Sequence, residues 1–76
     1  MIQIGSKVIL RTNNAIFDPC FIQRVDVEPG RIQDVKSVTV TYFAGYNKDK
    51  NTGEMHEDWK VETIQRKDMV SIAERI

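Results

Sequence analysis

The sequence predicts an all-β fold: a small five-stranded antiparallel barrel, closed or partly open, with an extended hairpin between its third and fourth strands. Three observations support this prediction. Five short segments alternate apolar and polar residues or are rich in β-branched residues, and tight or medium turns separate them. The chain has only 76 residues, and closing so small a sheet removes edges that water would otherwise wet. A chain of this length is expected to form one domain, residues 1–76.

The first strand is expected in the segment IGSKVILR, directly after a glycine turn. Val8 and Leu10 can face a core while Lys7 and Arg11 face water, which is the period of two that strands show. The segment TNNA follows as a polar loop.

The second strand is expected at residues 21–27, after a turn at Asp18-Pro19. Proline fixes its own φ and keeps the residue before it out of the helical region, so this pair predicts a turn. In the segment EPGR, Pro29 and Gly30 suit the two central positions of a type II turn. The next residues, IQDVK, are expected to extend that connection.

The third strand is predicted at residues 37–46, where β-branched residues dominate and Val38, Val40 and Tyr42 share one face. Gly45 indicates a bulge or bend. The polar segment NKDKNTGE forms a turn, and MHEDWKVETI alternates again as the fourth strand. Pairing between residues 42–47 and 54–59 would extend the hairpin well beyond the body of the domain.

The C-terminal segment fits two structures. Met69, Ile72, Ala73 and Ile76 have helical spacing, and Asp68 could cap such a helix. Alternatively, MVSI forms a short closing strand after a tight turn at residues 66–68. We favour the strand, followed by a frayed or briefly helical tail.

Composition narrows the function. Eleven basic residues balance eleven acidic ones, whereas nucleic-acid binders usually carry a basic excess. The single cysteine excludes a disulfide-stabilised secreted scaffold. No stretch has the length of a membrane span, and the N-terminus lacks the pattern of a signal peptide. We therefore expect a complete, stand-alone cytoplasmic protein.

The order of these segments resembles the SH3-like small barrels, a group that includes Tudor-like domains, KOW-like domains and a small barrel protein of photosystem I. The matching segments are GSKVILR, FIQRVDVEPG and SVTVTYF as the first three strands. WKVETI and RKDMVSI correspond to the fourth strand, a short helical turn and the closing strand. The segment from Asn47 to Glu57 is longer than the compact loop usual in these barrels. The resemblance implies a binding module for peptides, modified side chains or nucleic acid, and rarely an enzyme.

The aromatic residues offer the best candidate site. Tyr46 and Trp59 flank the long loop, and such residues are common anchors of protein interfaces, while Tyr42 is expected in the core. The predicted partner-binding residues are Tyr46, Lys48, Lys50, Met55 and Trp59. An alternative is an aromatic cage for a methylated cation, walled by Phe17, Tyr42, Tyr46 and Trp59.

Other chemistries have weaker support in the sequence. Glu54, His56, Glu57 and Asp58 could ligate a metal, but a single histidine and no second ligand cluster make a solvated hairpin tip the preferred interpretation. Cys20 has no activating neighbours, and no nucleophile or phosphate-loop motif occurs. We therefore predict no metal, no cofactor and no catalytic residue.

Two functions follow from these observations. The first is a non-enzymatic protein-interaction or regulatory module that docks on a larger protein, as small bacterial and phage proteins do, and that is a monomer or a homodimer. The second is a nucleic-acid-binding barrel, in which basic residues such as Lys7, Arg11, Lys48 and Lys50 surround a stacking aromatic residue. Acidic residues beside the same loop disfavour the second.

Overall fold

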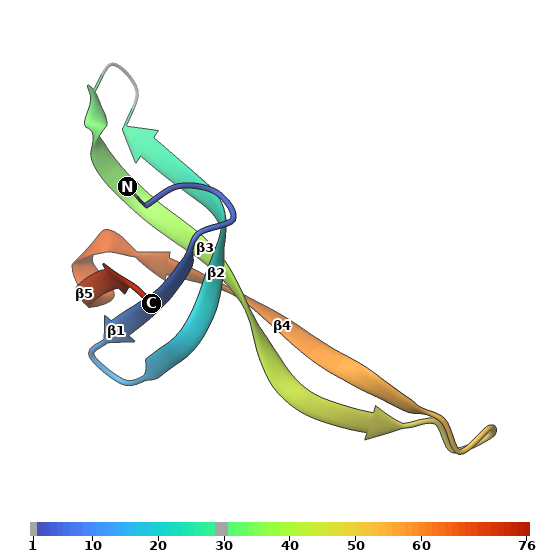
Figure 1. Cartoon of the computed structure of the whole chain (residues 1–76). Coiled ribbons are helices and arrows are strands. Elements are labelled where there is room, and N and C mark those ends of the chain that lie inside the picture. Colours follow the sequence, from blue (N-terminus) through green and yellow to red (C-terminus); the bar gives the residue numbers. More distant parts are fainter. Residues whose placement is uncertain (1, 29–30) are drawn as a thin grey trace.

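The computed structural model describes the backbone of residues 2–28 and 31–76 and shows one antiparallel sheet of five strands (Figure 1). A 3-10 helix, η1, joins the last two strands. The elements are β1 (Lys7–Thr12), β2 (Ile16–Glu28), β3 (Arg31–Lys48), β4 (Met55–Gln65), η1 (Arg66–Asp68) and β5 (Met69–Glu74). The predicted all-β, five-stranded antiparallel architecture is therefore confirmed. The turn predicted at Pro29 and Gly30 lies outside the described residues.

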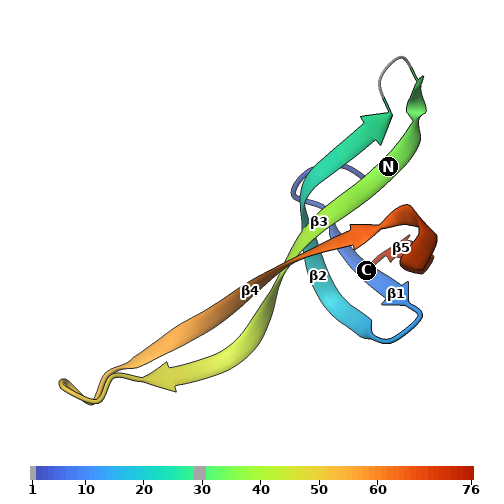
Figure 2. The ribbon, with the colours of Figure 1, turned by 180° about the vertical axis from the view of Figure 1, so that it is seen from behind.

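The strands follow the order β4-β3-β2-β1-β5 across the sheet, so β4 and β5 are its two end strands. These end strands do not pair with each other in the described part of the chain, and the sheet is not closed into a barrel. The short helix η1 leads directly from β4 into β5, which pairs with β1 at the other end of the sheet (Figure 2).

One face of the curled sheet holds the hydrophobic core. The side chains of alternate strand residues point to the same face, and Val8 and Leu10 are fully buried there as predicted. Lys7 and Arg11, on the other face of β1, are exposed. The buried set is Val8, Leu10, Cys20, Ile22, Val38, Val40 and Ile64. Phe17, Val25, Val35, Tyr42, Met69 and Ile72 pack partly buried against it.

The second strand begins earlier than predicted, and Asp18-Pro19 does not form a turn. Both residues lie inside β2, joined by a cis peptide bond. The ladder to β1 changes register there, since Phe17 pairs with Leu10 and Cys20 pairs with Val8. Proline has no N–H to donate to a ladder and is therefore accommodated at such a bulge.

The third strand also begins earlier than predicted. The segment IQDVK, expected to extend a connection, belongs to β3, and Val35 pairs with Val27 of β2. The valines explain this extension, because Val35 packs against the core. The burial of Val35 on the sheet therefore outweighed the local preference of this segment for a connecting loop.

The β3–β4 hairpin forms an arm that projects from the body of the domain (Figure 1). Pairing continues from Ser37 and Gln65 out to Lys48 and Met55. At the tip, the Asp49 carboxylate accepts a hydrogen bond from the Asn51 N–H at 2.8 Å, which stabilises the turn. The molecule measures 50 × 23 × 23 Å. The predicted long hairpin is therefore confirmed.

The C-terminal segment forms a strand rather than a helix. Residues Arg66–Asp68 make the predicted tight turn as η1, and β5 then pairs with β1 from Met69 to Glu74. Ile72 lies opposite Leu10 and packs against the core. Pairing to β1 buries Ile72 while it satisfies the backbone of both strands, whereas an isolated helix of this length would be marginal.

Candidate functional site

A bulge at Gly45 determines which face of the arm carries its aromatic residues. Phe43 pairs with Trp59, but Tyr46 pairs with Glu57, so β3 contains one extra residue between these pairs. Gly45 has a φ of +108°, a conformation that side-chain-bearing residues rarely adopt. Without this extra residue, strand alternation would put Tyr46 on the face opposite to Phe43. The bulge predicted at Gly45 is confirmed, and it turns Tyr46 onto the same face as Phe43.

Four aromatic side chains from three strands meet on the outer face of the sheet, opposite the core. We call this set the aromatic face: Phe21, Phe43, Tyr46 and Trp59. Centroid distances are 6.0 Å between Phe21 and Trp59, 5.7 Å between Phe43 and Trp59, and 5.1 Å between Phe43 and Tyr46. The rings are tilted or edge-on to one another, which their quadrupoles favour.

The aromatic face is open to solvent. Tyr46 is 63% exposed, Trp59 46% and Phe43 44%. Trp59 is held in place, because its indole N–H donates a hydrogen bond to the Glu57 carboxylate at 2.8 Å. Val61 is also exposed and lies two residues along β4 from Trp59, so it extends the same face. An exposed apolar surface of this kind, with oriented aromatic residues, is typical of a docking site.

The structure brings four of the five predicted partner-binding residues onto this side of the arm. Tyr46 and Trp59 belong to the aromatic face. Met55 lies four residues from Trp59 on β4, toward the tip of the arm, so its side chain is on the same face of the strand. Lys48 pairs directly with Met55. Lys50 lies in the turn at the tip, exposed and beyond the paired part of the hairpin. The surface expected for Tyr46 and Trp59 agrees with their exposure.

A hollow of about 450 Å³ adjoins the aromatic face at the base of the arm. It forms where the beginning of β2 pairs with β1 while β3 continues into the arm. Its lining is mostly apolar, with one carboxylate: Ile16, Phe17, Asp18, Pro19, Phe21, Tyr42 and Phe43. That carboxylate, Asp18, forms an ion pair with Arg75 at 3.1 Å. The hollow could receive one apolar side chain of a partner.

The proposed cage residues do not surround a single space. Phe17 packs on Tyr42 with a centroid distance of 5.1 Å, and both are partly buried against the core. Tyr46 and Trp59 instead contact Phe43, which is on the opposite face of β3 from Tyr42. The prediction that Tyr42 belongs to the core side is confirmed.

Charges around the aromatic face are few and mixed. Lys7 pairs with Phe21 at one end, and Lys48 lies toward the tip at the other. Glu57 lies between these lysines, next to Trp59. Arg24 is engaged with Asp26 at 2.8 Å. Binding a phosphate backbone would need a continuous row of basic side chains. Among the described residues, the Glu57 carboxylate interrupts the row between Lys7 and Lys48.

The acidic residues near His56 do not converge. His56 lies 3.8 Å from the Glu54 carboxylate, while Glu57 is on the other face of β4 and bonds to Trp59. Alternation along the strand therefore separates Glu57 from the other candidate ligands. Among the side chains described, those of residues 2–28 and 35–76, no three from His, Cys, Asp or Glu form a metal-binding group.

Cys20 is a buried core residue. Burial raises the pKa of its thiol above the ordinary value of 9.0, and the nearby negative charge of Asp18 raises it further, against a backbone hydrogen bond at Leu10 that lowers it. The thiolate, which is the reactive form, is therefore disfavoured. The sequence prediction of an apolar thiol agrees with this environment.

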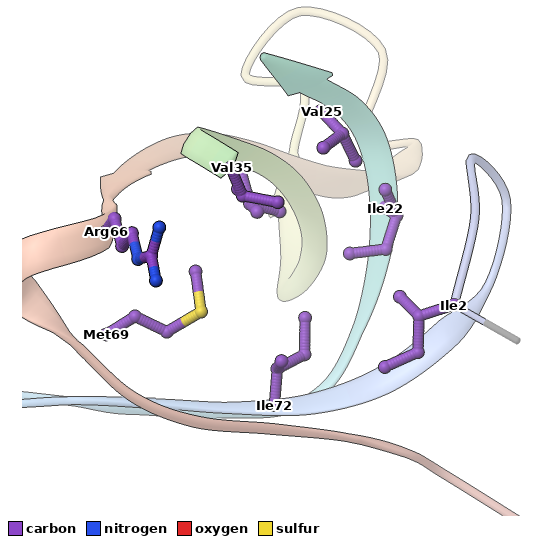
Figure 3. Close-up of a pocket in the computed structure, with 8 residues that line it drawn as sticks. Ile2, Ile22, Val25, Val35, Arg66, Met69 and Ile72 are labelled. Carbon is purple, nitrogen blue, oxygen red and sulfur yellow. The ribbon is translucent and has the colours of Figure 1, made fainter. Parts of the chain in front are cut away.

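A second hollow, of about 360 Å³, lies on the core side (Figure 3). Ile22 and Val38 of the core form part of its wall, and Met69 and Ile72 approach from the β5 side. Figure 3 shows the Arg66 side chain at its margin, next to Met69. This hollow continues the core and is separate from the aromatic face.

Phe21 and Phe43 complete the aromatic face, and neither was among the predicted site residues. Phe43 could have been found, because it alternates with Tyr42 and so had to lie on the face opposite the core. Phe21 could not be found in this way. Its place beside Trp59 depends on the pairing of Phe21 with Thr41 and of Thr41 with Val61, which local sequence does not specify.

Comparison with known protein families, with curated proteins and with solved structures gives no match for this chain. None of the described segments forms a helix with the length and apolar character needed to cross a bilayer. The case for a function therefore depends on the geometry of the aromatic face and its surroundings.

Proposed function

We propose that this chain is a non-enzymatic protein-interaction module of SH3-like type, which docks on a larger protein through the aromatic face and the adjoining hollow. The observation that carries the proposal is the group of four aromatic side chains on one exposed sheet face. Burying such residues against a partner would remove apolar area from water, the main source of binding free energy.

Two features of the fold support the SH3-like assignment. The sheet order β4-β3-β2-β1-β5 brings the last strand beside the first, and η1 lies between β4 and β5, where the resemblance implies a short helical turn. The gap between the end strands corresponds to a partly open form of such a barrel. The long arm is the feature by which this chain departs from the compact members of the group.

The mixture of charges favours a protein partner over a nucleic acid. A protein interface tolerates Lys7 and Lys48 at the rim and Glu57 near the centre, because the carboxylate already has a partner in Trp59. A nucleic acid would bring phosphates toward that carboxylate. Binding is therefore expected to depend weakly on salt.

The test is photo-crosslinking from two positions in native cell lysate, with and without nuclease. A photoreactive phenylalanine analogue replaces Tyr46 in one variant and Val70 in the other. Val70 is similarly exposed, at 62%, but lies on β5 and outside the aromatic face. We expect a discrete protein adduct at Tyr46 that survives nuclease and is absent at Val70.

Two outcomes would contradict the proposal. Equal adducts at both positions would mean that the aromatic face has no special affinity for proteins. Adducts to nucleic acid, or adducts that vanish on nuclease treatment, would support the nucleic-acid-binding alternative. In parallel, the Tyr46→Ala variant, checked for folding by circular dichroism, should lose the partner in pull-downs while Val70→Ala keeps it.

A further inference from the structure

The outer edge of β4 is unpaired along the arm. β4 is an end strand, and in the described part of the chain only β3 pairs with it. Figure 2 shows this edge free where the arm leaves the body. Of residues 55–63, all are exposed except Asp58, which is half-buried. An exposed strand edge of this length presents a row of hydrogen-bonding groups to another strand.

The backbone groups that face this free edge belong to the odd-numbered residues. The Lys60 carbonyl accepts a hydrogen bond from the Thr41 hydroxyl at 3.0 Å, so it points toward β3. Backbone groups of successive strand residues point to opposite sides. The N–H and C=O groups of Trp59 and Val61 therefore point to the free edge, where a second strand could bond to them.

The charges of β4 are self-complementary about Trp59. We propose that two copies of the chain form a symmetric dimer in which their β4 strands pair antiparallel with Trp59 at the two-fold axis. In this register Asp58 lies opposite the partner's Lys60, and His56 lies opposite the partner's Glu62. Symmetry repeats each pairing, which gives two Asp58–Lys60 ion pairs, and beside them two His56–Glu62 pairs in which the imidazole faces a carboxylate, on the inner side of the arm.

Geometry strengthens the central pairs. Since Trp59 has its backbone groups at the edge, it forms a hydrogen-bonded pair with its own copy. Asp58 and the partner's Lys60 then form a non-hydrogen-bonded pair, in which side chains are closer together. On the outer side, Trp59 would lie beside the partner's Trp59. The two aromatic faces would join into one surface without covering each other.

The neighbouring symmetric registers are unfavourable. With Asp58 at the axis, Asp58 opposes itself and Glu54 opposes the partner's Glu62. With Lys60 at the axis, Lys60 opposes itself and Asp58 opposes the partner's Glu62. Like charges directly opposite destabilise strand pairing. Charge therefore disfavours the two registers in which the pairing is slipped by one residue about Trp59.

The dimer goes beyond the proposed function and does not depend on it, because the β4 edge and the aromatic face are different surfaces. Sedimentation equilibrium of the full chain over a concentration series is the first measurement. We expect a reversible dimer, weakened by added salt because exposed ion pairs are screened. A chain that remains monomeric up to about 1 mM, the weak end of specific association, overturns the proposal.

Charge reversal identifies the register. In Lys60→Glu, residue 60 would repel the partner's Asp58, and in Asp58→Lys, residue 58 would repel the partner's Lys60. Each variant alone should dimerise at least about tenfold more weakly, since two pairs change from attraction to repulsion. Lys67→Glu, in η1 and away from this edge, is the control with the same charge change and should dimerise like the wild type.

Mixing the two charge variants gives the decisive result. A Lys60→Glu chain and an Asp58→Lys chain restore opposite charges at both central positions when they pair with each other. We expect heterodimers in the mixture and monomers in each separate sample. Monomers in the mixture, with both variants folded by circular dichroism, would exclude this register. Crosslinking of the protein partner at Tyr46 should persist in the monomeric variants. Loss of the dimer and loss of partner binding can therefore be told apart.

Discussion

Replacing Trp59 with alanine tests whether the aromatic face forms in solution. The chain has a single tryptophan, whose ring contacts Phe21 and Phe43 and whose N–H bonds to Glu57. The variant removes all three interactions at once. None of them involves a core residue, so the effect on stability should be moderate.

The expected magnitude follows from burial. Trp59 is 46% exposed, so roughly half of the ~250 Å² that a tryptophan can bury is removed from water, which corresponds to about 2–3 kcal/mol. The two ring contacts add about 1 kcal/mol together. The expected loss in the free energy of unfolding is therefore about 3–4 kcal/mol, against a total of about 4–11 kcal/mol for a chain of this length.

Urea unfolding followed by far-UV circular dichroism measures this loss. We expect the variant to remain folded, with a midpoint at lower urea and an unchanged slope. A loss below about 1 kcal/mol would mean that the rings do not pack together in solution. A loss above about 5 kcal/mol, the upper end for truncating a fully buried tryptophan, would mean that Trp59 is a core residue, and the description of an exposed face would then be wrong.

Three further predictions concern the core, the bulge and the thiol. Leu10→Ala should cost about 2–5 kcal/mol in urea unfolding, because Leu10 is fully buried; a cost below about 1 kcal/mol would refute its core position. Gly45→Ala should cost about 1–2 kcal/mol from its positive φ alone, since nothing lies within 4 Å of the added carbon, and should reduce Tyr46 crosslinking, whereas unchanged stability would argue against the bulge. Because the pKa of Cys20 is raised in the folded state, the folded chain holds that proton more tightly. The resulting stability is full below pH 9.0, the ordinary thiol pKa, and is lost as the pH rises through the folded-state pKa. Cys20→Ala should lack this loss in pH-dependent unfolding, and identical pH profiles would contradict the assignment.

Local sequence predicted the strands where residue type and period agree. Val8 and Leu10 lie two residues apart with charged residues on either side, Lys7 and Arg11, and both apolar side chains are buried. Val38 and Val40 do the same in the third strand, where they alternate with polar residues. The prediction was wrong where a local signal competed with the sheet. Asp18-Pro19 was expected to be a turn, but β2 continues through it at a bulge, because the strand as a whole gains its pairing with β1.

The candidate site was predicted in part for a related reason. Tyr46 and Trp59 stand out in the sequence because they flank a polar loop, and both are exposed. Phe21 is more than twenty residues away from either, and no local sequence pattern groups it with them. Only the pairing of β2 with β3 and of β3 with β4 brings its ring to Trp59.

Local patterns in the chain were enough to specify the β class, the five strands and the long hairpin, because alternation, β-branched residues and turn residues act over a few neighbouring positions. Which aromatic side chains share a surface was settled only by the pairing of distant strands. That outcome depends on strand register and on the single extra residue at Gly45, and a shift of one residue moves every side chain beyond it to the opposite face.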